Sequence, residues 1–224
     1  MLQARSISSN TSFREKIFSL DYVLIICILI LGVISAFVMY STDGGKFDYH
    51  TKNHIIRFIT FFLFFLIISF FQIRFWHQSS TLIYIFFFIL LLFVKYFGLT
   101  SSGSQRWIDF YFMNLQPSEL MKIGLILFLA KYYHRIPTNE VNRIKYLFLP
   151  IIALIAPVLL VVAQPDLGTS ILIAGGGIIV AWLAGVKVKF FAYLSILFIS
   201  LAPIAISFLK PYQKSRILTF LNPD

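Results

Sequence analysis

Two Gln-Pro dipeptides in this 224-residue chain each precede a long apolar run and stand beside an acidic residue. The first belongs to the sequence QPSE at 116–119, and the second belongs to the sequence QPD at 164–166. Proline suits the first position of a helix and an acid suits its first turn, so both motifs can mark plain helix initiation. The free N–H groups of a helix start can also hold an anion such as pyrophosphate, and the two carboxylates can instead bind a divalent ion.

Lys122 is a further candidate functional residue, because this charged side chain lies within the apolar run that follows the first Gln-Pro dipeptide. It comes three residues after Glu119, so the two side chains share one face of the predicted helix. Ionisable residues near or within a membrane normally face a bundle interior or a polar cavity, so this pair is either structural or functional. With Arg106 and Asp166, it makes up the candidate polar site. The supporting motif positions are Trp107, Gln116, Pro117, Ser118, Gln164, Pro165, Gly168 and Thr169.

The composition indicates which elements must position these residues. The chain is 59% hydrophobic and 12% charged, with a mean hydropathy of +0.86, whereas a soluble domain carries about 25% charged residues. These values exclude a soluble domain, a disordered chain and a disulfide scaffold. Seven apolar runs approach the roughly 20 residues that cross a bilayer core of about 30 Å. They are residues 22–40, 55–71, 82–97, 116–133, 146–163, 168–186 and 190–209.

The runs are unbroken and lack the alternation of barrel strands, so each is expected to be a helix. The predicted fold class is therefore all-α, a polytopic transmembrane helix bundle. The predicted inner segments hold ten Lys and Arg against five in the outer segments, which places the N-terminus in the cytoplasm. Both Gln-Pro motifs then lie at the outer side. The net charge of +10 reflects this orientation, and no nucleic-acid partner is expected.

The predicted organisation is a cytoplasmic segment at 1–20, a transmembrane bundle of seven helices at 21–209 and an outer segment at 210–224. The last segment is amphipathic and basic, and no finished structure is implied after it, so the sequence reads as a fragment. No Ser-His-Asp set, zinc spacing, P-loop or dinucleotide fingerprint occurs in the sequence. Physical reasoning alone therefore leaves an enzyme, a transporter and a scaffold open, each with an outward-facing polar site.

Four motifs, GSQRWIDF, QPSELMK, QPDLGTS and PYQKSRILTFLNP, occur in an order and spacing that resemble the SEDS family (shape, elongation, division and sporulation). The resemblance covers nearly the whole chain from Asp21, and its first and last motifs are more similar to the elongation branch than to the division branch. It implies a multi-pass peptidoglycan glycosyltransferase of the bacterial inner membrane, which polymerises lipid II for cell-wall elongation and rod shape. The implied partner is a class B penicillin-binding protein, the transpeptidase. A lipid II flippase and a non-catalytic scaffold for the transpeptidase are the alternatives.

The resemblance also implies roles for the polar residues. Arg106 and Lys122 would assist the leaving pyrophosphate, while Glu119 would hold Lys122 in place. Asp166 would organise the outer site, and Arg216 matches a basic position that is a further candidate for the phosphate. No cofactor is indicated except a divalent metal ion such as Mg2+.

The family's architecture implies that part of the machinery follows this sequence. Family members have ten helices with both ends in the cytoplasm, so seven are expected here and residues 210–224 begin a large periplasmic loop. The family's catalytic aspartate lies in a DPLG-like motif just beyond the sequence FLNP, and is therefore expected after Asp224. The 224-residue chain alone is expected to have little or no activity.

Overall fold

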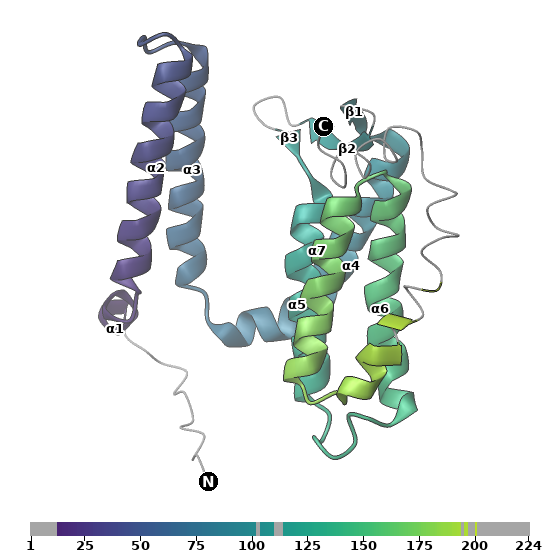
Figure 1. Ribbon diagram of the computed structural model, residues 1–224. Coiled ribbons are helices and arrows are strands. Elements are labelled where there is room, and N and C mark those ends of the chain that lie inside the picture. Colours follow the sequence, from purple (N-terminus) through teal and green to yellow (C-terminus); the bar gives the residue numbers. More distant parts are fainter. Residues whose placement is uncertain (1–12, 102–103, 110–113, 194, 197–199, 201–224) are drawn as a thin grey trace. The chain divides into compact units, whose positions relative to one another are not determined.

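The computed structural model describes residues 13–101, 104–109, 114–193, 195–196 and 200 (Figure 1). The chain divides into two compact units, residues 1–75 and 76–224. The single bundle over residues 21–209 stays a prediction. The helices and strands are α1 (Phe13–Phe18), α2 (Tyr22–Thr42), α3 (Tyr49–Ser69), α4 (Ile73–Phe97), β1 (Leu99–Ser101), β2 (Ser104–Asp109), β3 (Asn114–Leu115), α5 (Pro117–His134), α6 (Ile144–Ala163) and α7 (Leu167–Leu183).

Six of the seven predicted apolar runs correspond to helices α2 to α7, which confirms the helical prediction for these runs. Within the described residues, α2, α3, α4 and α6 are long and apolar enough to cross a membrane. α5 carries Glu119, Lys122 and Lys131, and α7 has 17 residues, so these two stay predicted spans. The seventh run, 190–209, is described only at 190–193, 195–196 and 200, and these residues are helical.

Two helices begin earlier than the apolar pattern predicts. α3 begins at Tyr49 rather than at residue 55, and α4 begins at Ile73 rather than at residue 82. At the start of α3, the Asp48 side chain accepts a hydrogen bond from the Tyr49 N–H at 2.8 Å. Helices extend through polar residues because each added residue gains a backbone hydrogen bond. Hydrophobicity therefore located the apolar part of each helix and missed its polar first turns.

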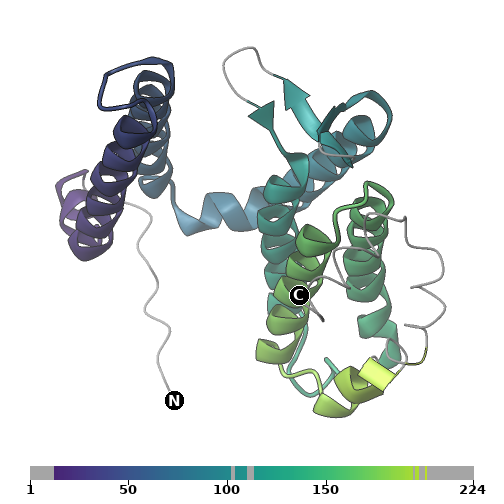
Figure 2. The same ribbon diagram turned by 45° about the horizontal axis from the view of Figure 1, so that its top comes forward.

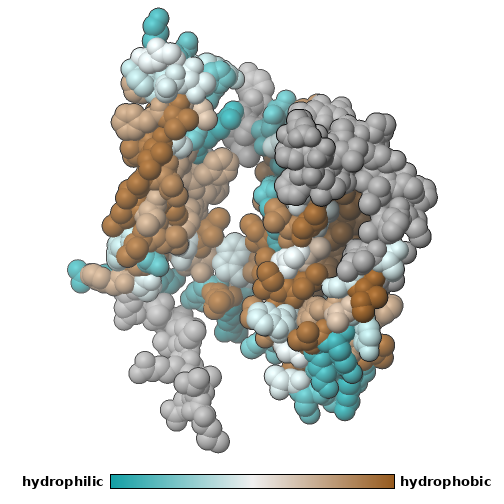
Figure 3. Space-filling view, viewed as in Figure 1, coloured by the Kyte–Doolittle hydropathy of each residue, from teal (hydrophilic) through white to brown (hydrophobic). Residues whose placement is uncertain are grey.

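In the first unit, α2 and α3 form a hairpin, drawn as the two long purple and blue helices in Figure 1. Ser35 Oγ lies 2.8 Å from His54 Nε2 across the pair. Gly32 lets the Phe58 ring approach α2, because a Cβ at this position would overlap the ring. Figure 3 shows hydrophobic side chains along the middle of both helices and hydrophilic ones at the turn between them. This distribution suits a hairpin whose middle lies in lipid.

The turn of this hairpin is held by a carboxylate. Asp43, which follows α2, accepts hydrogen bonds at Oδ2 from the Thr51 N–H at 2.8 Å and the Thr51 hydroxyl at 2.7 Å. Thr51 lies in the first turn of α3 and is 1% exposed. Its hydroxyl, and then its N–H, lower the pKa of Asp43 below the ordinary value of 3.8. The end of α2 thus caps the start of α3.

The core of the second unit lies among α5, α6 and α7, which are grouped side by side in both ribbon views (Figures 1 and 2). Leu125, Leu129 and Ile173 are buried in this core. A Cβ at Gly177 would lie 2.5 Å from Leu154 Cδ1, so the missing side chain permits α6 and α7 to pack closely. Close backbone approach through small residues is a common way for membrane helices to associate.

α6 contains two internal prolines, and each lacks the N–H that would bond the carbonyl four residues earlier. Pro157 frees the carbonyl of Ala153. The Tyr84 hydroxyl of α4 donates to that carbonyl at 2.9 Å. A side chain from a neighbouring helix therefore replaces the hydrogen bond that the proline removed, which lipid could not do.

The second proline is compensated in the same way. Pro150 frees the carbonyl of Tyr146, and the Tyr132 hydroxyl of α5 donates to it at 3.0 Å. Both irregular points of α6 are thus tied to a neighbouring helix. The paired prolines and tyrosines join α6 to α4 and to α5 by hydrogen bonds as well as by packing.

Three short strands lie between α4 and α5. They form a small sheet that the all-α prediction did not include. The sheet has the order β1-β2-β3 and is antiparallel, with Leu99 opposite Trp107 and Ile108 opposite Leu115. Gln105 Nε2 donates to the Gly98 carbonyl at 2.8 Å and joins β2 to the end of α4. Because β3 leads directly into α5, the sheet holds β2 at the start of that helix.

Candidate functional site

Asp166 is the centre of a polar cluster at the starts of α5 and α7. Its Oδ2 atom lies 3.1 Å from Arg106 Nη1 and accepts hydrogen bonds from Gln116 Nε2 at 3.0 Å and Thr169 Oγ1 at 2.9 Å. Its Oδ1 atom accepts the Thr169 N–H at 3.3 Å. The Asp166 side chain is 8% exposed. We call Arg106, Gln116, Asp166 and Thr169 the Asp166 cluster.

Each member of the Asp166 cluster is placed by local structure. Asp166 is the N-cap of α7, a position where aspartate is favoured because it accepts an N–H of the first turn. Gln116 is the N-cap of α5 and makes no side-chain bond to its own helix, so its amide is available to Asp166. Arg106 comes from β2. Two neighbouring elements, β2 and α5, therefore meet the start of α7, about 50 residues further along the chain, at one carboxylate.

Arg106 retains donors beyond the one that binds Asp166. A guanidinium has five N–H donors, and the structure gives an acceptor to Nη1. Its Nε atom is buried and has no partner among the described residues. The guanidinium carbon also lies 5.9 Å from the centre of the Trp107 ring, and the Arg106 side chain is 28% exposed. Arg106 is thus anchored, partly accessible and able to bind a further anion.

Glu119 and Lys122 form the ion pair that their spacing predicts, with 2.8 Å between Glu119 Oε2 and Lys122 Nζ. The Glu119 side chain is 54% exposed and that of Lys122 is 25% exposed. The pair lies on α5, within two turns of its start, and no described contact joins it to Asp166. The four predicted residues therefore form two pairs, Arg106 with Asp166 and Glu119 with Lys122.

The supporting motif positions serve different purposes. Gln164 is 2% exposed and donates from Nε2 to the Leu91 carbonyl at 3.0 Å, which fixes the α6–α7 turn to α4. Pro117 is the first residue of α5, as predicted. Ser118 is 1% exposed, and its hydroxyl has no partner among the described residues. A Cβ built at Gly168 would meet nothing within 4 Å, so tight packing does not explain this glycine.

One further predicted position, Arg216, lies outside the described residues, so its expected phosphate contact stays a prediction. Pro165 lies in the turn between α6 and α7.

The residues around Asp166 do not fit a divalent metal ion such as Mg2+. A divalent ion needs several oxygen ligands, whereas Asp166 is surrounded by hydrogen-bond donors and a cation. The other carboxylate, Glu119, is paired with Lys122. In the part of the chain that the structure describes, no three His, Cys, Asp or Glu residues are grouped to hold a metal. These donors suit an anion, and in the structure they hold the Asp166 carboxylate.

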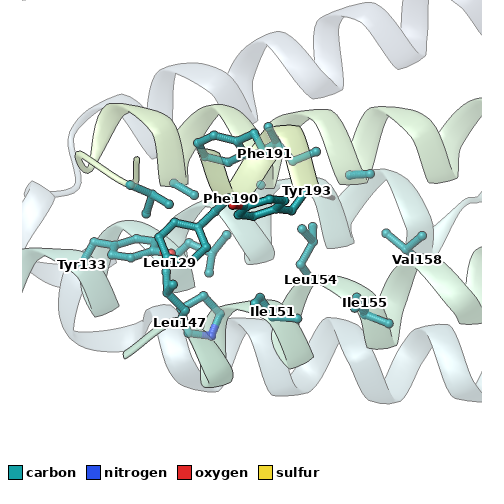
Figure 4. Close-up of a pocket in the computed structure, with 16 residues that line it drawn as sticks. Leu129, Tyr133, Leu147, Ile151, Leu154, Ile155, Val158, Phe190, Phe191 and Tyr193 are labelled. Atoms are coloured by element: carbon teal, nitrogen blue, oxygen red, sulfur yellow. The ribbon is translucent and has the colours of Figure 1, made fainter. Parts of the chain in front are cut away.

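An apolar pocket that the sequence did not indicate lies among α5, α6, α7 and the residues after α7 (Figure 4). Its volume is about 320 Å³, and none of the described residues that line it is charged. Leu129, Tyr133, Leu154, Phe190 and Phe191 are among them. Helical periodicity marks such side chains as apolar and does not reveal where they leave a gap. The pocket suits hydrocarbon, and the only polar side chains among its described lining residues are those of Tyr133 and Tyr193.

Comparison with known proteins extends over nearly the whole chain. The family model described as cell cycle protein, which covers FtsW, RodA and SpoVE, matches residues 16–224. The probable peptidoglycan glycosyltransferase FtsW of Buchnera aphidicola subsp. Schizaphis graminum is 36% identical over 189 residues, covering 82% of this chain and 53% of that protein. The peptidoglycan glycosyltransferase MrdB of Escherichia coli K12 is 32% identical over 217 residues, covering 96% of this chain and 58% of that protein. The chain thus spans about half the length of these curated relatives.

Solved structures are similar in fold. A chain from a peptidoglycan synthase complex, described as coordinating polymerization and crosslinking, has a TM-score of 0.75 and 24% identity, covering 92% of this chain and 60% of that chain. RodA of Thermus thermophilus has a TM-score of 0.68 and 24% identity, covering 83% of this chain and 60% of that chain. Relatives named FtsW and MrdB both match, so the preference for the elongation branch stays a prediction.

Proposed function

The chain belongs to the FtsW/RodA/SpoVE family of cell cycle proteins, and from this premise we propose that its gene product is a peptidoglycan glycosyltransferase that polymerises lipid II. Family membership and four membrane-length helices make it a multi-pass protein of the bacterial inner membrane. Two curated relatives are named peptidoglycan glycosyltransferases, which supports the proposed activity. Because the chain spans about half of their length, the activity is assigned to the complete gene product. The process it serves is cell-wall synthesis in elongation and rod shape.

The observation that carries this proposal is the anchoring of Arg106 by Asp166, whose carboxylate Gln116 and Thr169 also hold. In the polymerisation of lipid II, the donor sugar leaves an undecaprenyl pyrophosphate on which negative charge develops. A fixed cation with free donors stabilises such a leaving group, because it need not reorganise during the reaction. Arg106 meets this requirement at the predicted outer side of the membrane, because Asp166 holds its guanidinium while its side chain stays 28% exposed.

Lys122 is the second proposed pyrophosphate contact. Glu119 holds its ammonium at 2.8 Å and so restricts the flexible lysine side chain. The acceptor sugar hydroxyl must lose a proton, and a carboxylate can take it. Asp166 is a poor candidate for this base, since its two oxygens already accept three side-chain bonds and one backbone bond. The family resemblance implies an aspartate beyond Asp224 for that role.

We assign a class B penicillin-binding protein as the partner that crosslinks the product. The similar fold of a chain from a peptidoglycan synthase complex supports this assignment.

The proposal is tested with the complete gene product, purified and supplied with lipid II, by separating glycan polymer on a gel. An Arg106→Gln variant keeps a hydrogen-bonding group beside Asp166 and removes the positive charge, so polymerisation should fall about 100-fold. Arg74→Gln, a change at an exposed arginine of α4, is the matched control and should keep full activity. Unchanged polymerisation by Arg106→Gln would exclude the proposed role of its charge.

The same assay examines the second pair. Glu119→Ala and Lys122→Ala should each lose polymerisation while remaining in the membrane, and full activity in either would remove that residue from the mechanism. Translocation of lipid II across vesicles without polymer formation would favour the flippase alternative.

A further inference from the structure

Two four-residue segments of the second unit repeat one order of side-chain types. Residues 143–146 read Arg-Ile-Lys-Tyr at the start of α6, and residues 187–190 read Lys-Val-Lys-Phe after α7. Each segment is basic, aliphatic, basic and aromatic in turn. Both follow the ends of helices that begin at the Asp166 cluster, and α5 has 18 residues. The repeated order therefore occurs about 27 Å from that cluster, at the other end of the bundle.

Asn142 joins the two segments. Its side-chain Nδ2 donates to the Gly185 carbonyl at 3.2 Å, and its Oδ1 accepts the Lys187 N–H at 2.7 Å. Both the donor and the acceptor of the Asn142 amide thus bond to the backbone at or just before the second segment. As a result, Arg143, Lys145, Lys187 and Lys189 lie on two segments that the Asn142 side chain ties together. We call these four residues the inner basic surface.

The inner basic surface is open to its surroundings. All four side chains are exposed, and Figure 3 shows hydrophilic side chains gathered at the lower end of this unit. Arg143 binds Glu140 at 3.0 Å, yet its side chain is 60% exposed. The surface therefore keeps a net positive charge that one neighbouring carboxylate does not cancel.

Helix stability does not account for the cations of the first segment. Arg143 is the N-cap of α6 and makes no capping bond, and Lys145 follows in the first turn. The helix dipole disfavours positive charge at this end. Orientation of the protein in the membrane requires only that the loops carry Lys and Arg. It does not require the hydrogen bonds of Asn142 or the repeated order of side-chain types in the two segments.

The residues between the cations point to lipid. Ile144 is 83% exposed and Val188 is 67% exposed, which is unfavourable for aliphatic side chains in water. The ammonium of Lys145 lies 4.5 Å from the centre of the Tyr146 ring. Cations beside exposed aliphatic and aromatic side chains are typical of segments at the headgroup boundary of a bilayer.

We propose that the inner basic surface binds the phosphate headgroups of anionic phospholipids in the adjacent leaflet, with Ile144 and Val188 entering the acyl boundary. The charge bias of the sequence makes this the cytoplasmic leaflet. The occupant is a bilayer lipid rather than a soluble anion, because the aliphatic side chains would gain nothing from the latter. This inference does not depend on the proposed enzymatic activity.

The test uses the complete gene product in nanodiscs of phosphatidylcholine with an added fraction of phosphatidylglycerol. Native mass spectrometry then gives the ratio of the two lipids that remain bound. A double variant Lys187→Gln/Lys189→Gln should reduce the preference for phosphatidylglycerol about 30-fold, from the contribution of each cation near an anionic surface. The charge-conserving Lys187→Arg/Lys189→Arg variant should retain the preference and shows that the segment tolerates substitution.

Two further variants separate an organised surface from charge alone. Asn142→Ala removes the tie and keeps every cation, and should weaken the preference severalfold. Lys46→Gln/Lys52→Gln makes the same change of charge at exposed lysines near the α2–α3 turn, and should leave the preference unchanged.

Three results would overturn the inference. The first is an Asn142→Ala variant whose preference for phosphatidylglycerol equals that of the wild type. The second is an equal loss in the Lys46→Gln/Lys52→Gln variant. The third is full displacement of the lipid by inorganic phosphate at the same concentration, which would indicate a site for free phosphate. Polymerisation is not a readout here, so failure of the proposed function would leave this result unaffected.

Discussion

Asp166 and Arg106 form the ion pair of the Asp166 cluster, with 3.1 Å between Asp166 Oδ2 and Arg106 Nη1. The Asp166 side chain is 8% exposed and the Arg106 side chain is 28% exposed, so the pair lies between a surface salt bridge and a buried one. Removing one partner leaves the other in a partly desolvated position. The Gln116 amide and the Thr169 hydroxyl would then remain as neutral partners of Asp166, which limits the damage.

A double-mutant cycle with Asp166→Asn and Arg106→Gln measures this dependence. Each single variant should be destabilised, and the double variant should be destabilised by less than the sum, with a coupling of about 1–3 kcal/mol. The measurement is reversible unfolding of the complete gene product in mixed micelles. Strict additivity would show that the 3.1 Å contact contributes nothing to stability.

At the scale of elements, α6 shows how an apolar helix tolerates two prolines. Each freed carbonyl accepts a tyrosine hydroxyl from another helix, at 2.9 Å for Ala153 and 3.0 Å for Tyr146. In lipid no water is present to bond these carbonyls, so the tyrosines matter more than they would at a soluble surface.

Tyr84→Phe should destabilise the protein by about 1–3 kcal/mol, because it leaves the Ala153 carbonyl buried without a donor. The added change Pro157→Ala restores the backbone N–H, so in that background Tyr84→Phe should cost almost nothing. Thermal unfolding of the single and double variants is the measurement. Tyr96→Phe, at a 68% exposed tyrosine of the same helix, is the control. Equal destabilisation by Tyr84→Phe in both backgrounds would show that the hydroxyl does not compensate the proline.

The α2–α3 turn gives a pH dependence at the same scale. The pKa of Asp43 is lowered by the Thr51 hydroxyl first and the Thr51 N–H second. A lowered native pKa means that the carboxylate adds stability above about its ordinary value of 3.8, and that this stability is lost as the pH falls through the native pKa.

Thr51→Val should therefore raise the pKa of Asp43 toward 3.8, so that the turn loses its cap at a higher pH than in the wild type. The measurement is the carboxyl carbon resonance of Asp43 as a function of pH. Thr60→Val is the control, since that hydroxyl bonds the Ile56 carbonyl of its own helix. A titration of Asp43 that Thr51→Val leaves unchanged would contradict the proposed cause.

At the scale of the whole molecule, the charge bias predicts that the α2–α3 turn lies outside and the α5–α6 loop lies inside. In a Cys27→Ser background, Lys46→Cys should react with a membrane-impermeant maleimide in intact spheroplasts. Thr138→Cys should react only after permeabilisation. Both positions are exposed in the structure, so reactivity reports the side of the membrane. The opposite pattern would invert the topology and move the Asp166 cluster to the cytoplasmic face.

The sequence by itself determined the helical membrane fold, the family and the residue types of the polar site. The fold and the family depend on local properties of the sequence. A run of about 20 apolar residues must be helical in lipid, and the four ordered motifs are recognised from the sequence without any knowledge of contacts between elements. The start of α5 at Pro117 was predictable for the same reason, because proline and acid preferences act within one turn. The polar first turns of α3 and α4 were missed, because hydrophobicity does not mark them.

Only the tertiary structure decided which polar residues meet. Arg106 binds Asp166 because β2 and the start of α7 are brought together, and the sheet that carries β2 has no strong pattern in the sequence. The hydrogen bond from Tyr84 to the Ala153 carbonyl, which Pro157 leaves free, could not be predicted from the sequence either, since it joins residues on two helices. Chain position fixes neighbours within a helix, whereas contacts between elements depend on how apolar faces pack, and many packings share one apolar pattern.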